Sequence, residues 1–301
     1  MNVMELPVVV GVDGSESALR ALDRAAEEAA LRDTELRVVY ASLWERYEGA
    51  ALADDLGGTP AEPVLARDIV ESAARRARQR HPGLRVTADT VPEEPEYALV
   101  RESRNASLLV TGSRGRSGLS EALLGSVSLT VAGHAHCPVL VVRGEPAVRP
   151  HGRIVVGVGA ESAEALRFAA DEARRRGAVL EAVRAWKAPA QGSPSPAALA
   201  GESARHRAER AARELDEAVE SALKELADIP GLPDAVPGAE VRRRTVEGPA
   251  RTVLVDVAEG ADLVVVGAKR RPRSFGLQLG RVTHRVLHHA PCPVVVVPER
   301  G

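Results

Sequence analysis

A group of glycines and serines follows an apolar segment in the first half of the chain. Gly112-Ser-Arg-Gly115 is separated by nine residues from Gly125-Ser126, and the stretch comes directly after Leu108–Thr111. Glycine lets backbone amides approach a ligand closely, because it has no Cβ. A helix, expected over Leu119–Ala135, would add unpaired N–H groups and the positive end of its dipole, which favour a phosphate. The order of strand, glycine loop and helix therefore predicts a phosphate-binding site.

Backbone and hydroxyl groups of this loop are the expected phosphate ligands. They belong to Gly112, Gly115, Gly125, Ser126 and Ser128. Arg114 and Arg116 add positive charge to the loop. The spacing is neither that of a Walker P-loop, which needs Gly-Lys-Ser/Thr, nor that of the dinucleotide fingerprint, which is Gly-x-Gly-x-x-Gly at the first strand. An ordinary turn is the alternative interpretation.

The same pattern occurs twice, and the second copy differs where a ligand would be contacted. Val8–Asp13 recurs as Ile154–Gly159, and the apolar segment before the glycine loop recurs before Gly267. Three expected ligand positions have changed together in the second copy. Asp13 is replaced by Gly159, Gly115 by Arg270, and Ser126 by Arg281. We therefore expect one competent site in the first repeat and a degenerate one in the second.

Composition limits the fold and the partners. The 301 residues suit two domains of about 150 each. Aromatic residues make up only 2%, and the apolar residues are mostly Val, Ala and Leu, which favours parallel strands buried on both faces. The formal net charge of −2 gives no general attraction to nucleic acid or to an anionic membrane. Because we find neither a long apolar run nor a signal-peptide pattern, we expect a cytoplasmic protein.

Strand and helix patterns alternate along both repeats. The strands of the first repeat are expected at 7–12, 35–41, 85–90, 108–111 and 139–143, and those of the second at 154–158, 179–185, 240–246, 263–266 and 294–297. This order predicts a parallel, doubly wound sheet with right-handed crossovers in each repeat. Ligands of such sheets bind beyond the carboxyl ends of the strands. Asp13 and Gly112 should therefore lie at the same edge.

The Gly-x2-Gly-x9-Gly-Ser spacing, the two first strands and the two Cys-Pro-Val segments resemble the universal stress protein family over nearly the whole chain. The resemblance implies two tandem Rossmann-like α/β domains of five parallel strands, at 1–145 with an intact nucleotide loop and at 151–301 with a degenerate one. It also implies that the last strands, Val139–Arg143 and Val294–Pro298, pair in an internal pseudo-dimer. Family members with this motif bind ATP, and Mg²⁺ is expected to accompany the phosphates.

The resemblance also assigns nucleotide-binding positions. They are Val12, Asp13, Ala41, Gly112, Ser113, Arg114, Gly115, Arg116, Gly125, Ser126, Val127 and Ser128. Asp13 is expected near the adenine or the ribose, and Ala41 is expected to offer the adenine a backbone contact. The alternative for Asp13 and Gly14 is a turn that caps the first helix.

Three other groups of residues have simpler interpretations. The basic loop Lys269–Arg273, together with Arg281, is read as a solvated loop; the alternatives are an anion site without nucleotide specificity and an arginine contribution to a partner. Histidines gather near the last strands, and His284 and His288 are four positions apart, but without a third ligand they are read as structural or surface residues. Cys137 and Cys292 occupy matching positions and are read as small buried side chains.

The sequence shows no set of catalytic residues beside the predicted phosphate-binding loop. Hydrolysis needs a positioned water, a base and charge stabilisation, and the sequence displays none of these. We therefore expect an ATP-binding protein that acts in stress or dormancy signalling through an unidentified protein partner, with pairing of two chains as a further option. The alternatives are a slow ATPase or nucleotide hydrolase and a nucleotide-free interaction scaffold.

Overall fold

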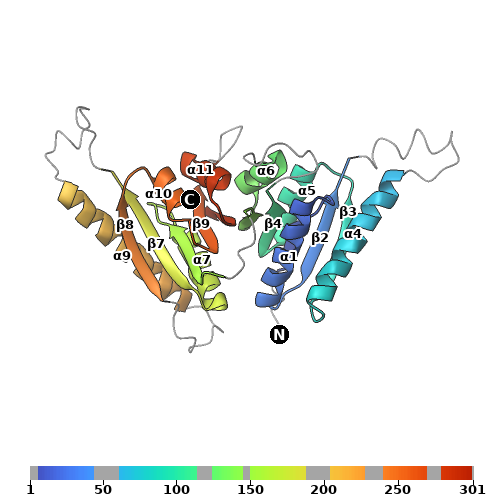
Figure 1. The fold of residues 1–301 in the computed structure, drawn as a ribbon, viewed down its shortest axis with the longest axis horizontal. Coiled ribbons are helices and arrows are strands. Elements are labelled where there is room, and N and C mark those ends of the chain that lie inside the picture. The colour runs from blue at the N-terminus through green and yellow to red at the C-terminus, as the bar shows by residue number, and fades with distance from the viewer. Residues whose placement is uncertain are drawn as a thin grey trace. The chain divides into compact units, whose positions relative to one another are not determined.

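The computed structural model describes residues 6–43, 61–113, 124–144, 150–187, 204–227, 240–269 and 279–299, with the backbone alone at 61–64. The chain divides into two compact units, Met1–Arg143 and Gly144–Gly301. In each unit the strands lie side by side and helices cover both faces of the sheet (Figure 1).

The strands of the first unit follow the order β3-β2-β1-β4-β5 and are all parallel. They are β1 (Val8–Gly11), β2 (Leu36–Ala41), β3 (Val86–Val91), β4 (Leu108–Gly112) and β5 (Val139–Val142). Helices α1 (Glu16–Leu31) and α4 (Ala61–Arg80) cover one face, and α5 (Pro95–Glu102) and α6 (Ser126–His134) cover the other. A 3₁₀ turn, η1 (Ser103–Asn105), follows α5. The strand order reverses between β1 and β4, which is where a ligand site is expected.

The second unit repeats this arrangement with the order β10-β9-β6-β7-β8. Its strands are β6 (Arg153–Gly157), β7 (Val179–Trp186), β8 (Val241–Glu247), β9 (Leu263–Lys269) and β10 (Val294–Glu299). Helices α7 (Ala163–Arg176) and α9 (Ala204–Ala227) pack on one face, and α10 (Ala250–Asp256) and α11 (Arg281–His289) pack on the other.

Apolar runs and helix signals account for these elements. Val8, Val9 and Val10 are all fully buried, as expected for a central parallel strand that is covered on both faces. The buried stripe of α1 is mostly alanine, which lets the helix approach the sheet closely. Ser15 caps this helix, because its hydroxyl accepts a hydrogen bond from the Ala18 N–H at 3.2 Å.

The α/β class with two tandem parallel-sheet domains is confirmed. The helix after the glycine loop, however, begins at Ser126 and not at Leu119; residues 119–123 lie outside the described ranges. Gly125 has an extended backbone, and its N–H bonds the Ser113 carbonyl, so a helix cannot run through it. In the second unit β10 runs to Glu299, two residues beyond the predicted end. The pairing of the two last strands stays a prediction.

Candidate functional site

Val12 and Asp13 form the turn that joins β1 to α1. The Val12 N–H bonds the Val39 carbonyl at 2.9 Å, which ties the turn to β2. The Ser15 N–H donates to Asp13 Oδ1 at 2.9 Å, and Gly14 has a φ of 82°, so the Asp13 carboxylate closes a turn ahead of the helix. This is the alternative that the sequence left open for Asp13. A role in binding the adenine or the ribose stays a prediction.

Hydrogen bonds join the two ends of the glycine loop. The Ser113 N–H bonds the Val142 carbonyl at 3.0 Å, and the Gly125 N–H bonds the Ser113 carbonyl at 2.9 Å. The buried Ser128 hydroxyl donates to the Gly112 carbonyl at 2.6 Å. The end of β4 and the start of α6 are therefore neighbours, although the loop between them lies largely outside the described residues.

Helix α6 begins without a capping side chain. Gly125 is its N-cap, and no side-chain oxygen bonds the first turn. Within the part of the chain that the structure describes, we see no acceptor for the N–H groups of Ser126, Val127 and Ser128. The Ser126 hydroxyl makes one long contact of 3.4 Å with Glu96 Oε1 of α5. This helix end offers several N–H donors and a positive dipole end at the carboxyl edge of the sheet.

Thr111, the residue before Gly112, carries a buried hydroxyl. Its side chain is only 3% exposed, and its Oγ1 has no hydrogen-bond partner among the described residues. An unsatisfied buried hydroxyl costs about 1–3 kcal/mol, so it calls for an explanation. The matching position of the second unit is Val266, which is apolar. Thr111 lies outside the glycine motif, and only an alignment of the two repeats distinguishes it from Val266.

Gly112 lies under the first turn of α1. A Cβ at this position would come within 2.5 Å of the Ser17 hydroxyl and 2.8 Å of the Ser17 carbonyl oxygen. In the second unit a Cβ at Gly267 would instead lie 2.6 Å from Glu299 Oε1. The same strand position therefore faces a serine of the helix in one unit and a carboxylate from the last strand in the other.

Glu299 places its carboxylate at the N-terminus of α7. Its two oxygens accept hydrogen bonds from the N–H groups of Glu164 and Ala165, both at 3.0 Å, and the residue is only 5% exposed. Burial raises the pKa of Glu299 and outweighs the effect of the two backbone donors, which lower it. The second unit thus satisfies the start of α7 with its own carboxylate.

The predicted site residues fall into three sets. Val12, Asp13 and Ala41 follow or end β1 and β2, and Ala41 is half-buried. Gly112 and Ser113 lie at the end of β4, beside the segment from Gly125 to Ser128. Arg114, Gly115 and Arg116 lie outside the described residues. The described members gather at the carboxyl edge of the sheet, and their contact with a ligand stays a prediction.

The remaining candidates carry no metal centre in the part of the chain described. The rings of His284 and His288 lie 4.4 Å apart, but no group of three or more His, Cys, Asp or Glu side chains is placed to hold a metal ion among these residues. Cys137 and Cys292 are buried and form no disulfide, as predicted. Lys269 pairs with Glu161 at 2.6 Å, and Arg270 to Arg273 lie outside the described residues.

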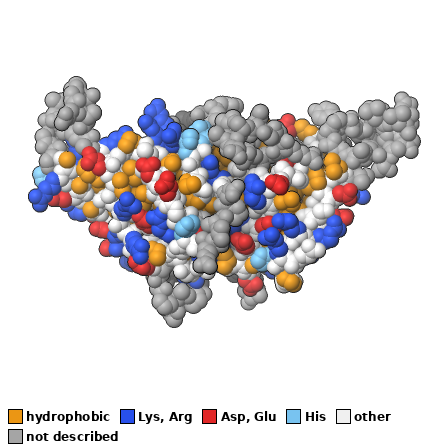
Figure 2. All heavy atoms as spheres, viewed as in Figure 1, with side chains coloured by type: hydrophobic (Ala, Val, Ile, Leu, Met, Phe, Trp, Pro, Cys, Tyr) orange, Lys and Arg blue, Asp and Glu red, His pale blue; other side chains and the backbone are white. Residues whose placement is uncertain are grey.

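Charges are mixed over the described surface. Figure 2 shows Lys and Arg side chains interspersed with Asp and Glu on the displayed face. None of the described helices combines the length and the apolar character that crossing a membrane requires.

Comparisons with known proteins agree with this fold. The model of the universal stress protein family matches residues 5–143 and again residues 151–298. One universal stress protein of Mycobacterium tuberculosis is 31% identical over 310 residues, which cover 97% of this chain and 94% of the relative. Another from the same organism is 32% identical over 321 residues, covering 97% of each chain.

Solved structures give the same result. A universal stress protein from Archaeoglobus fulgidus matches with a TM-score of 0.66 and 18% identity, over 97% of this chain and 98% of its own. A universal stress protein solved in complex with cAMP is 32% identical and covers 46% of this chain and 98% of its own, with a TM-score of 0.35. On the two family-model matches and the identity to full-length relatives, the chain belongs to the universal stress protein family, with two copies of the family domain in tandem.

Proposed function

We propose that the first domain binds one ATP molecule per chain and that this binding serves stress or dormancy signalling through a protein partner. The observation that carries the proposal is the uncapped start of α6, which lies beside the end of β4 at the switch point of the sheet. Phosphate groups are the ligands that such N–H donors favour. The Gly-x2-Gly-x9-Gly-Ser spacing is the reason to specify ATP.

Two features of the first domain fit a nucleotide. The Thr111 hydroxyl lacks a partner among the described residues, and a ligand at this edge would supply one if it reaches β4. No side chain caps α6, because its N-cap is Gly125; α11 also follows a glycine, but it begins with Arg281 where α6 begins with Ser126. Gly115 and the arginines beside it would complete the cradle from the loop.

Mg²⁺ is the cation that we expect with the phosphates, because it is usually held by one or two carboxylates together with phosphate oxygens. Glu96 offers a carboxylate here, since its Oε1 accepts a hydrogen bond of 3.4 Å from the Ser126 hydroxyl. Without a cation it would repel a phosphate at the start of α6. The matching residue of the second domain is Arg251, so the repeats differ in charge at this point.

The second domain is proposed to bind no nucleotide. It has Gly159 in place of Asp13, and Arg281 begins α11 where Ser126 begins α6. The Glu299 carboxylate adds a negative charge beside Gly267 when it is ionised. The loss of the Asp13 carboxylate and the charge of an ionised Glu299 disfavour a nucleotide at the second edge, whereas Arg281 removes the Ser126 hydroxyl but adds a positive charge.

Isothermal titration of the full chain with ATP, with and without Mg²⁺, tests the proposal. The expected result is one site per chain and weaker binding when EDTA replaces Mg²⁺. Mass analysis of nucleotide that co-purifies with the chain is an independent check. Two sites per chain would overturn the proposed asymmetry, and an absence of binding at millimolar ATP would favour the nucleotide-free scaffold.

A phosphate-release assay separates binding from hydrolysis. We expect no turnover beyond the uncatalysed rate, because we see no general base or water-positioning residue at this edge among the residues that the structure describes. Turnover that disappears in the Gly115→Arg variant would support the slow ATPase instead. Turnover that persists in that variant would indicate a contaminating enzyme.

A further inference from the structure

The edge strand β3 of the first domain has backbone groups that face away from its sheet. The Leu36 N–H bonds the Arg85 carbonyl at 2.9 Å, and the Ser42 N–H bonds the Val91 carbonyl at 3.1 Å. Alternate residues of a parallel strand point to the same side, so Val86, Ala88 and Thr90 turn their N–H and carbonyl groups outward. The Val86 carbonyl accepts a bond from Arg78 at 2.7 Å. We see no acceptor or donor for the other outward groups among the described residues.

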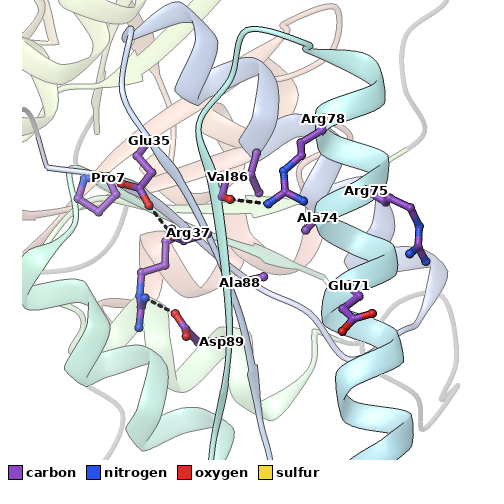
Figure 3. A pocket seen from close by; sticks show the side chains of 11 residues that line it. Pro7, Glu35, Arg37, Glu71, Ala74, Arg75, Arg78, Val86, Ala88 and Asp89 are labelled. Atoms are coloured by element: carbon purple, nitrogen blue, oxygen red, sulfur yellow. Dashed lines mark hydrogen bonds and ion pairs between the residues drawn. The ribbon is translucent and has the colours of Figure 1, made fainter.

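A groove of about 700 Å³ wraps this edge. Figure 3 shows side chains of α4 on one side of β3 and the pair formed by Arg37 and Asp89 on the other. Thr87, Ala88 and Asp89 are all exposed, so the strand is open at its edge. An open edge of this kind is a template for pairing with another strand.

The matching edge strand of the second domain, β8, is protected by charged side chains. Strand β8 carries three consecutive exposed arginines, from Arg242 to Arg244, and they pair with Glu240, Asp216 and Glu181. Charged side chains along an edge are a common defence against strand addition. Strand β3 has a single charged residue, Asp89, and that charge is already paired with Arg37.

Helix α4 supplies the charges that would select a partner for β3. Glu71 and Arg75 lie one turn apart in the wall of the groove, and both are exposed. Arg75 bonds the Ser72 hydroxyl at 3.0 Å, and neither Glu71 nor Arg75 forms an ion pair with another described residue. If a two-fold axis passes between Glu71 and Arg75, each acid faces the base of the second copy, as a self-complementary interface requires.

The position of these charges agrees with one two-fold axis. Helix α4 runs opposite to β3, and Arg78 lies level with Val86 through their hydrogen bond. The midpoint of Glu71 and Arg75 is about 8 Å further along the helix, at a rise of about 1.5 Å per residue. On the strand the same distance is about two residues, at about 3.3 Å each. The midpoint is therefore level with Ala88, the central outward-facing residue of β3.

We propose that two copies of this chain pair through β3 in an antiparallel arrangement with Ala88 on the two-fold axis. Ala88 then faces Ala88 of the second copy, and Val86 faces Thr90. Glu71 of each copy meets Arg75 of the other across the axis. The inference does not depend on nucleotide binding.

Exchanging the charges of Glu71 and Arg75 tests whether these residues pair between two copies, and it leaves the sequence of β3 unchanged. Sedimentation of the full chain up to about 10⁻⁴ M should show a dimer, since this concentration detects even an association with a Kd of tens of micromolar. Glu71→Arg and Arg75→Glu should each weaken the dimer at least about tenfold, because each places like charges together. The double variant Glu71→Arg/Arg75→Glu should restore it. The control is Arg205→Glu on α9, which should leave the association unchanged.

A cysteine at the axis tests the register. Ala88→Cys should form a disulfide-linked dimer under mild oxidation, because facing residues of this kind have Cα atoms about 5.5 Å apart, within the range of a disulfide. Both native cysteines are buried and should not compete. Arg243→Cys, on the guarded strand β8, is the matched control and should remain monomeric on a non-reducing gel. A monomer at every concentration, or a dimer that the single charge variants leave intact, would overturn the proposal.

Discussion

The two domains share a strand order but differ at the carboxyl edge of their sheets. In the first domain Gly112 faces Ser17 of α1, α6 begins with Ser126, and a buried threonine ends the core of β4. In the second domain Gly267 faces the carboxylate of Glu299, and α11 begins with Arg281. Helices α6 and α11 both begin after a glycine without a side-chain cap, and α1 and α7 are both capped, by Ser15 and by Glu299, so the two edges differ in their side chains and charges and not in the number of open helix starts.

The two domains differ most at buried polar groups whose satisfaction affects stability. The first domain keeps an unsatisfied buried hydroxyl at Thr111. The second domain replaces the hydroxyl with Val266 and provides α7 with the Glu299 carboxylate. Departures of this kind are expected at functional sites, because a ligand rather than the protein completes the interactions.

Gly115→Arg is expected to have the largest effect. It introduces the side chain of Arg270 into the first loop, so ATP affinity should fall on the order of 100-fold or more, the cost of losing two charge-assisted hydrogen bonds. Isothermal titration measures the loss. Gly83→Arg is the control, because a Cβ at this exposed turn would meet no atom within 4 Å, and it should bind ATP normally. The reverse change Arg270→Gly should not create a second site, and tight binding there would contradict the account.

Gly112→Ala and Gly267→Ala compare the packing around the matching glycines of β4 and β9. The first places a Cβ 2.8 Å from the backbone carbonyl oxygen of Ser17, which cannot move alone, so it should destabilise the first domain by about 1–3 kcal/mol. The second meets the end of the Glu299 side chain, which can shift without moving the backbone, so its cost should be smaller and should come from weakened hydrogen bonds to Glu164 and Ala165. Native-state hydrogen exchange of amides in α1 and α7 reports each domain separately. Equal losses would show that both contacts are rigid.

Thr111→Val and Val266→Thr exchange the buried side chains of the matching strands. The first should stabilise the ligand-free first domain by about 1 kcal/mol, and the second should destabilise the second domain by about 1–3 kcal/mol, because an unsatisfied hydroxyl is removed in one and created in the other. Hydrogen exchange in β4 and β9 measures both. If the hydroxyl serves the nucleotide, Thr111→Val also weakens ATP binding about tenfold. Unchanged ATP affinity would make Thr111 a structural feature alone.

Glu299→Gln should give the smallest effect, and one that depends on pH. Burial raises the folded-state pKa of Glu299 above the value of 4.5 that an unperturbed glutamate has. The stabilisation from its protonated form is therefore complete below about pH 4.5 and is lost as pH rises through the folded pKa. The amide variant has no such loss, so the stability difference between variant and wild type should grow over that window.

Thermal unfolding of the second domain from pH 4 upward records this difference. The control is Glu220→Gln on the exposed face of α9, for which the difference should stay flat. A flat difference for Glu299→Gln as well would mean that the carboxylate is ionised at no cost in the folded domain.

Much of the fold could be predicted because it rests on local patterns. Runs such as Val8–Val10 are apolar on both faces, and Ser15 and Ser17 are both plausible starts for the first helix, of which Ser15 is the cap observed. The repeat and its substitutions at Gly159 and Arg281 could also be found by comparing the halves. The start of α6 was predicted wrongly, because the bond from the Gly125 N–H to the Ser113 carbonyl depends on how the loop returns to the strand.

The contacts at the carboxyl edge of the second domain's sheet could not be predicted from local patterns. Glu299 reaches Glu164 and Ala165, which are more than 130 positions away in the sequence. Gly112 and Ser17 are likewise distant in the chain and meet only when α1 packs over β4. A glutamate after a proline in a last strand carries no signal of its own. Such pairs follow from tertiary packing, which residue spacing does not encode.

The insertion of β4 next to β1 has a consequence for synthesis of the protein. Val8 pairs with Leu108, 100 positions later, and Ile154 pairs with Leu263 in the same way. At about 5–20 residues per second, a ribosome needs about 5–20 s to deliver β4 after β1. During that interval one edge of a wholly apolar strand has no partner. We therefore expect the nascent first domain to expose this edge to other chains until its fourth strand emerges.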